Sequence, residues 1–179
     1  LEESWLYEAI TETYIPLIDM LEGLVRDRVP CRLTISLTPP LLNMLSDGLL
    51  QERYLRRLER LIELAGKERV RTRHDPTFAN LAAMYEQLFS HSRTVFVERY
   101  GRDLIQAFRR FQELGILEII GCAATHGYLP LMQVNEKAVR AQIRVGVDEY
   151  RRLLGRDPRG FWLPECAYYP GVDTILKEH

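Results

Sequence analysis

The chain has 179 residues, of which 46% are hydrophobic, and its 24 Lys and Arg residues nearly balance its 25 Asp and Glu residues. This apolar content is enough to bury a core without help from disulfides or metals. The near-neutral charge supplies no long-range field for nucleic acid or for an anionic membrane surface, so we expect neither as a partner. A neutral glycan fits this balance but is not required by it, and the sequence does not identify protein partners.

The cysteines and the apolar runs bear on the cellular compartment. Cys31, Cys122 and Cys166 are widely spaced and form no CxxC pair, which argues against a disulfide framework and against a cysteine-based zinc site. No apolar run approaches the roughly 20 residues that cross a bilayer. Glu2 and Glu3 stand where a signal peptide would be basic. We therefore predict a cytoplasmic protein without a membrane span.

The first third of the chain predicts helices around one short strand. Apolar residues recur at helical spacing over residues 5–25, and Pro16 predicts a kink or a new helix start there. Residues 32–37 are β-branched and end at Pro39 and Pro40, which predicts a buried strand that leads into a loop. A strongly amphipathic helix is predicted over residues 49–68.

Helices and strands then alternate to the end of the chain. Further helices are predicted over residues 81–98, 103–114 and 134–154, and further strands over residues 117–121 and 160–164. This alternation indicates an α/β fold with a parallel sheet, either open or closed into a barrel. Because we find no repeat, low-complexity tract or linker, we expect one compact unit.

Two segments follow predicted strands and are candidates for chemistry, because parallel α/β folds carry their active sites at the carboxyl ends of strands. They are residues 122–130 and 164–171. Glu165 comes directly after an apolar strand, where an ionised carboxylate costs several kcal/mol unless it is paired or used. Glu165 is therefore either a reacting carboxylate or a helix cap or ion-pair partner, for example of Arg159.

His126 lies between Thr125 and Gly127, and the glycine would let the backbone turn and expose the imidazole. A hydrogen-bonded structural histidine is the alternative. The four histidines of the chain show no i,i+4 metal spacing, so we predict no catalytic metal.

Four aromatic side chains are candidates for contact with a sugar ring: Trp5, Trp162, Tyr168 and Tyr169. Each would offer a flat apolar surface to the C–H face of a pyranose. The competing interpretation is core packing, which the position of Trp162 within a strand favours.

Residues 124–130 (ATHGYLP) and 161–171 (FWLPECAYYPG) resemble two motifs of glycoside hydrolase family 57, in the form found in its 1,4-α-glucan branching enzymes. Residues 2–17 and 33–39 also resemble that subgroup, and the similarity spans nearly the whole chain. The resemblance implies part of a seven-stranded (β/α) barrel with long helical insertions. It also implies a retaining reaction on α-glucans such as amylose or glycogen, in glycogen synthesis, without metal or cofactor.

The same resemblance implies roles for individual residues. Glu165 corresponds to the nucleophile, and His126 corresponds to a histidine in the sugar subsite next to the scissile bond. Trp5 and Trp162 correspond to glucan-binding positions, although Trp162 has the barrel wall as its alternative.

The family pattern departs from this chain at both ends. The family's acid/base aspartate would lie beyond His179, its His-x-His strand would precede Leu1, and its helical domain would follow later. We therefore expect residues 1–179 to be a partial catalytic domain. An α-amylase or a 4-α-glucanotransferase of the family and a non-catalytic glycan-binding fragment remain alternatives. A polysaccharide deacetylase-like barrel would need an Asp/His metal set that the sequence does not show.

Overall fold

The computed structural model describes residues 2–179, which form two compact units. The first unit combines the chain up to Pro30 with Asp47–Ala107, and the second combines Cys31–Ser46 with Phe108–His179. The expectation of one compact unit is therefore wrong. Because each unit is assembled from separated stretches of chain, no linker-like composition marks the boundary.

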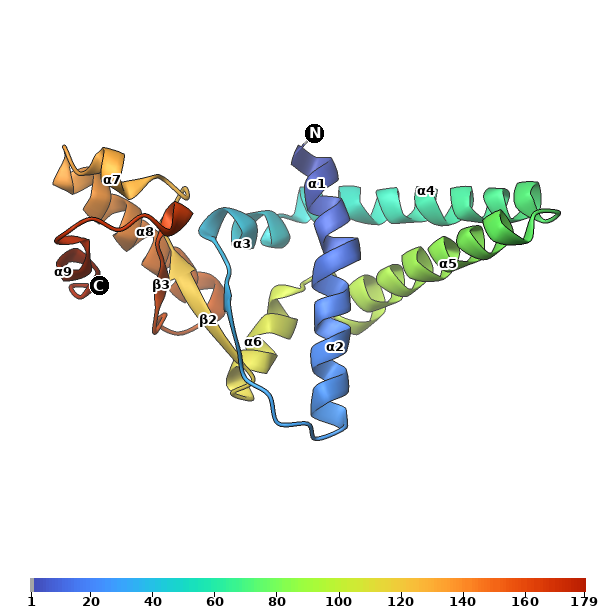
Figure 1. Cartoon of the computed structure of the whole chain (residues 1–179), viewed down its shortest axis with the longest axis horizontal. Coiled ribbons are helices and arrows are strands. Elements are labelled where there is room, and N and C mark those ends of the chain that lie inside the picture. Colours follow the sequence, from blue (N-terminus) through green and yellow to red (C-terminus); the bar gives the residue numbers. More distant parts are fainter. Residues whose placement is uncertain (1) are drawn as a thin grey trace. The chain divides into compact units, whose positions relative to one another are not determined.

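The first unit begins with a continuous helical segment (Figure 1). It consists of α1 (Glu2–Ala9), a π-helical stretch η1 (Ile10–Tyr14) and α2 (Ile15–Arg26). Pro16 lies in the first turn of α2, directly after the π-helical stretch η1, so the type of helix changes where the sequence predicted a kink or a new helix.

The rest of the first unit is a helical hairpin, in which α4 and α5 run side by side (Figure 1). Its elements are α4 (Gly48–Thr72), α5 (Pro76–Arg93) and the π-helical η2 (Thr94–Arg99). The carboxylates of Asp47 and Asp75 accept hydrogen bonds from amides in the first turns of α4 and α5, which fixes both helix starts. In the core, Tyr54 OH lies 2.9 Å from Thr11 Oγ1.

The second unit contains the sheet. Its strands are β1 (Leu33–Ser36), β2 (Leu117–Cys122) and β3 (Phe161–Trp162), in the order β1-β2-β3 and all parallel, as predicted. Its helices are α3 (Pro39–Ser46), most of α6 (Ile105–Glu113), α7 (Leu129–Met132), α8 (Glu136–Leu154) and α9 (Val172–Leu176). A 3₁₀ turn, η3 (Pro164–Cys166), follows β3.

Two features of β1 differ from the prediction. The strand is not buried: Leu33 and Thr34 are exposed, because β1 lies at the edge of this sheet with β2 on one side only. The following prolines do not begin a loop but occupy the first turn of α3, where proline is well tolerated.

The sheet register decides which aromatic of β3 enters the core. Gly121 pairs with Phe161, and Cys122 pairs with Trp162, so Phe161 and Trp162 lie on opposite faces. Phe161 packs against the cluster that contains Ile143 of α8. Trp162 is 45% exposed, so the core packing that its place in a strand favoured is not observed. None of the helices within residues 2–179 has the length and apolar character that crossing a membrane requires.

Candidate active site

The two residues singled out for chemistry lie together at the carboxyl ends of neighbouring strands. His126, after β2, places its Nε2 3.4 Å from Oε1 of Glu165, after β3. The Glu165 side chain is 70% exposed and that of His126 is 38% exposed. Arg159, the alternative ion-pair partner, instead places its Nη1 3.9 Å from Oε2 of Glu118.

Both loops hold side-chain-bearing residues in the left-handed backbone region. His126 has φ 54°, and the consecutive residues Glu165 and Cys166 have φ 57° and 56°. Such residues cost on the order of 1–3 kcal/mol each and persist where surrounding contacts fix them, often at functional sites. The local sequence does not reveal this strain.

The turn at His126 is made differently from the prediction. His126 itself adopts the left-handed conformation, and Gly127 is not among the glycines with positive φ. The glycine instead provides space, since a Cβ at position 127 would lie 2.6 Å from Cε of Met132. This methyl is the end of a flexible side chain, so the contact favours a small residue at 127 without requiring glycine.

A glutamine of α8 holds the loop that carries His126. Gln142 accepts a hydrogen bond from the Thr125 amide through Oε1 at 3.0 Å and donates to Thr125 Oγ1 through Nε2 at 2.9 Å. Its backbone carbonyl accepts from the Ala124 amide at 2.9 Å. Sequence reasoning missed Gln142, because nothing in the local pattern links it to a loop 17 residues earlier.

Gly146, one turn further along α8, makes this approach possible. A Cβ at position 146 would lie 2.3 Å from the carbonyl oxygen of Cys122, so only glycine lets the helix come this close to the end of β2. A glycine inside an amphipathic helix is a signal of close packing that the sequence offered.

Cys122 contacts the other ring nitrogen of His126, with Sγ 3.3 Å from Nδ1. The residue is fully buried, and burial raises the pKa of its thiol above the ordinary value. Cys166, beside Glu165, is exposed.

The aromatic candidates are divided between the two units. Trp162 and Tyr168 of the second unit are 45% and 61% exposed, whereas Tyr169 packs against the cluster around Ile143. Trp5 lies on α1 of the first unit and is 63% exposed. The glucan-binding roles of Trp5 and Trp162 stay predictions. Within the described residues, no group of three or more His, Cys, Asp or Glu side chains is placed to hold a metal ion.

Comparison with known proteins decides the family. The model of the family described as Glycosyl hydrolase family 57 matches residues 1–179. The chain belongs to glycosyl hydrolase family 57.

The proteins similar to this chain carry more than one activity in their names. The chain is 36% identical to the 1,4-alpha-glucan branching enzyme of Thermococcus kodakarensis, over 97% of this chain and 25% of that protein. The crystal structure of the alpha-amylase AmyC from Thermotoga maritima matches with a TM-score of 0.94 and 47% identity, over 99% of this chain and 34% of that one.

A third similar protein is again a branching enzyme. The GH57-type branching enzyme from Pyrococcus horikoshii matches with a TM-score of 0.88 and 36% identity, over 94% of this chain and 31% of that one. The chain therefore spans about a quarter to a third of the length of these similar proteins.

Proposed function

We propose that this chain is the nucleophile-bearing part of a retaining α-glucan-active enzyme, namely a 1,4-α-glucan branching enzyme with Glu165 as the nucleophile. The observation that carries the proposal is the 3.4 Å approach of His126 Nε2 to Glu165 Oε1 at the carboxyl ends of adjacent parallel strands. Membership of family 57 and the two branching-enzyme relatives support it.

In the first step a carboxylate oxygen of Glu165 attacks the anomeric carbon of an α-1,4-linked glucan. The bond from that carbon to the glycosidic oxygen breaks, and a second carboxylic acid gives its proton to the leaving oxygen. Retaining enzymes place their two carboxyl groups about 5 to 5.5 Å apart. We assign the second acid to the remainder of the protein, outside the 179 residues.

In the second step the 6-hydroxyl of another glucan chain attacks the same carbon. Its proton goes to the conjugate base left by the second acid, the ester to Glu165 breaks, and an α-1,6 branch results. His126 donates a hydrogen bond to a sugar oxygen next to the scissile bond as positive charge develops on the ring. The exposed faces of Trp162 and Trp5 are the proposed stacking surfaces for glucose units.

The Glu165 side chain is exposed to solvent, as expected if the rest of the active site is supplied by the remainder of the protein. A seven-stranded (β/α) barrel would place further strands beside the open edges of β1 and β3 and enclose the carboxylate. The three parallel strands and their helices are the portion of such a barrel contributed by this chain.

The second candidate function is hydrolysis by an α-amylase, and the 47% identity to AmyC favours it. Both activities share the glycosyl ester and differ in whether water or a sugar hydroxyl resolves it; a 4-α-glucanotransferase would use a 4-hydroxyl. Incubating the full-length protein with amylose separates them. New α-1,6 linkages without a rise in reducing ends support branching; they are detected as short chains that a debranching enzyme releases from the product. Reducing ends that rise before any debranching support hydrolysis.

The same preparation tests the nucleophile and the non-catalytic alternative. A fluorinated glucosyl reagent that forms a slow-turnover ester should label the peptide containing Glu165, and the Glu165→Gln variant should remain unlabelled. Binding of glucan without labelling would identify a glycan-binding protein and would overturn the catalytic proposal.

A further inference from the structure

Three side chains of the second unit form a line of contacts from the core to solvent. Cys122 Sγ lies 3.3 Å from His126 Nδ1, and His126 Nε2 lies 3.4 Å from Glu165 Oε1. Cys122 is fully buried, while the Glu165 side chain is 70% exposed. The two ring nitrogens of one histidine thus face two chemically different groups.

The chemistry of these groups favours one arrangement of protons. A neutral imidazole has one N–H donor and one acceptor nitrogen, and an ionised carboxylate only accepts. A proton on Nε2 faces the Glu165 carboxylate favourably, whereas a lone pair there would repel it. Nδ1 is then the acceptor, and it needs a donor.

The Cys122 thiol is a suitable donor for Nδ1. Its burial raises its pKa, so the sulfur keeps its proton at neutral pH. A thiol is both a weak donor and a weak acceptor, so the direction of this bond is set at the other ring nitrogen: a proton on Nε2, beside the Glu165 carboxylate, leaves Nδ1 as the acceptor. The contact of 3.3 Å is within hydrogen-bond range for sulfur.

We propose that Cys122 is a positioning residue for the reaction: its S–H donates to Nδ1 of His126 and keeps the ring proton on Nε2, beside Glu165. This inference rests on the proposed function of Glu165 as nucleophile. Cys122 itself neither gains nor loses a proton during turnover.

The fixed tautomer has a consequence at each stage. Before attack, Nε2–H faces the carboxylate. When Glu165 becomes a neutral ester, the same N–H is free to donate to a sugar oxygen, and it returns to the carboxylate when the ester breaks. Without the thiol, the proton can reside on Nδ1, and Nε2 then presents a lone pair to the carboxylate.

The S–H stretching band in the infrared spectrum tests the hydrogen bond without any glucan. In the full-length protein, the difference spectrum against Cys122→Ser isolates the band of Cys122. We expect a band lowered in frequency by hydrogen-bond donation, which moves to the free-thiol position in His126→Ala. A band that His126→Ala leaves in place would overturn the inference.

Steady-state kinetics then test the positioning role. We expect Cys122→Ala to lower kcat roughly tenfold, the size of one lost hydrogen bond in the transition state, with KM little changed. Cys122→Ser, whose hydroxyl also donates to Nδ1, should recover most of kcat. Equal kcat for Cys122→Ala and wild type, or no recovery with serine, would overturn the role of Cys122. Failure of Glu165 labelling would overturn the nucleophile instead and leave the infrared shift in place, so the two failures are distinguishable.

Discussion

The α4–α5 hairpin and the loops after β2 and β3 use their side chains in opposite ways. On the hairpin, charged residues pair with neighbours on exposed surface, as Lys67 does with Glu63 at 2.5 Å and Arg71 with Glu68 at 2.6 Å. Such pairs contribute about 0–1 kcal/mol each. In the loops, His126 and Glu165 meet across two strands on a strained backbone.

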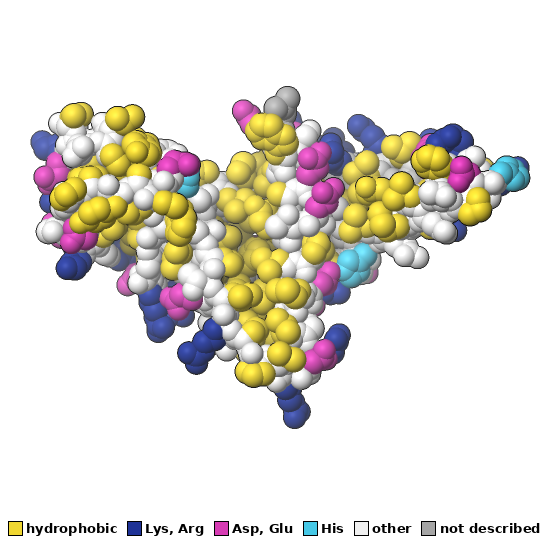
Figure 2. All heavy atoms as spheres, in the orientation of Figure 1, with side chains coloured by type: hydrophobic (Ala, Val, Ile, Leu, Met, Phe, Trp, Pro, Cys, Tyr) yellow, Lys and Arg dark blue, Asp and Glu magenta, His cyan; other side chains and the backbone are white. Residues whose placement is uncertain are grey.

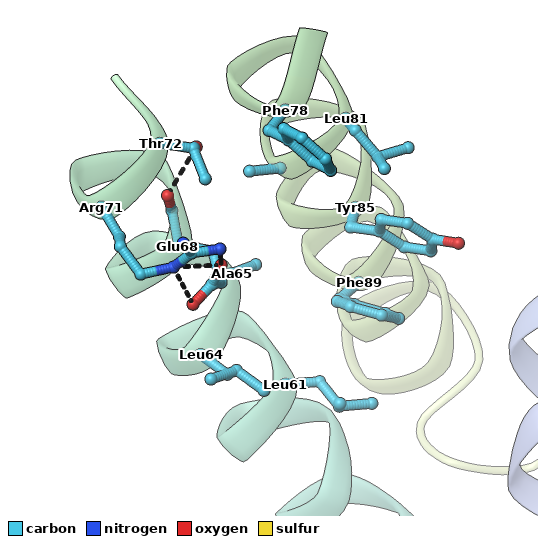
Figure 3. Close-up of a pocket in the computed structure, with 11 residues that line it drawn as sticks. Leu61, Leu64, Ala65, Glu68, Arg71, Thr72, Phe78, Leu81, Tyr85 and Phe89 are labelled. Carbon is cyan, nitrogen blue, oxygen red and sulfur yellow. Dashed lines mark hydrogen bonds and ion pairs between the residues drawn. The ribbon is translucent and has the colours of Figure 1, made fainter. Parts of the chain in front are cut away.

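The hairpin also contains an apolar cavity. A cavity of about 320 Å³ lies between α4 and α5, lined by Phe78, Tyr85 and Phe89 of α5 and by Leu61, Leu64 and Thr72 of α4 (Figure 3). Hydrophobic side chains lie among charged ones on the surface of this hairpin (Figure 2).

The apolar cavity of the hairpin and the candidate active site differ in the groups that line them. The hairpin cavity is lined almost wholly by carbon, with Glu68 and Arg71 at its rim bonded to each other. The candidate site shows instead convergent polar groups, left-handed residues and loop bracing from α8. Substitutions matched between the two regions should therefore have unequal effects.

The largest difference is expected for two glutamates. Glu165→Gln should lower glucan turnover in the full-length protein by several orders of magnitude, because a neutral amide cannot form the glycosyl ester. Glu68→Gln on the hairpin should leave turnover unchanged. Circular dichroism and iodine-based assays of both variants make the test, and more than a few per cent residual activity in Glu165→Gln would contradict the nucleophile.

Two helix glycines should differ in the sign of their effect on stability. Gly146→Ala should lower the free energy of unfolding by about 3 kcal/mol, because the new Cβ would meet the Cys122 carbonyl oxygen. Gly66→Ala on α4 should raise it by about 0.5–1 kcal/mol, since its Cβ comes no closer than 3.6 Å to another group. Urea unfolding curves measure both, and a Gly146→Ala variant as stable as the wild type would refute the close packing of α8.

Aromatic residues should separate by their effect on glucan binding. Trp162→Ala and Trp5→Ala should each weaken binding by roughly 1–2 kcal/mol through loss of a stacking surface. Phe78→Ala, which removes an aromatic ring that is 56% exposed on the hairpin, should not. Calorimetric titration with a maltooligosaccharide distinguishes them, and equal losses in all three would remove the assignment of the tryptophans.

The smallest effect is expected at a helix cap. Asp75→Ala should lower the free energy of unfolding by about 1 kcal/mol, because the amides of Thr77 and Phe78 lose their acceptor. Turnover should not change. A loss of activity alone, with the thermal midpoint unmoved, would assign the hairpin a part in the reaction.

The sequence predicted elements best where one local signal decided them. The helices of residues 49–68 and 134–154 were recognised from apolar periodicity, and the second ends at Gly155, a left-handed residue. Strand β2 was recognised from its apolar run between loops. In each case neighbouring residues along the chain determine the structure.

Prediction failed where distant residues decide. The division into two units, the exposed edge of β1 and the choice of Phe161 over Trp162 as the residue that faces the core all depend on contacts between distant parts of the chain. The bracing of the loop by Gln142 likewise arises from contacts between α8 and the loop. The sequence placed His126 and Glu165 after two parallel strands, whereas their approach to 3.4 Å is a finding of the structure.

The closeness of α8 to the end of β2, permitted by Gly146, has a consequence for transplanting this motif. The seven-residue stretch around His126 does not carry its own shape, because the amides of Ala124 and Thr125 are held by a helix that comes later in the chain. A graft onto another scaffold would have to bring Leu117 through Leu154 as one block. The smallest portable piece is thus a strand, its loop and the helix that clamps it.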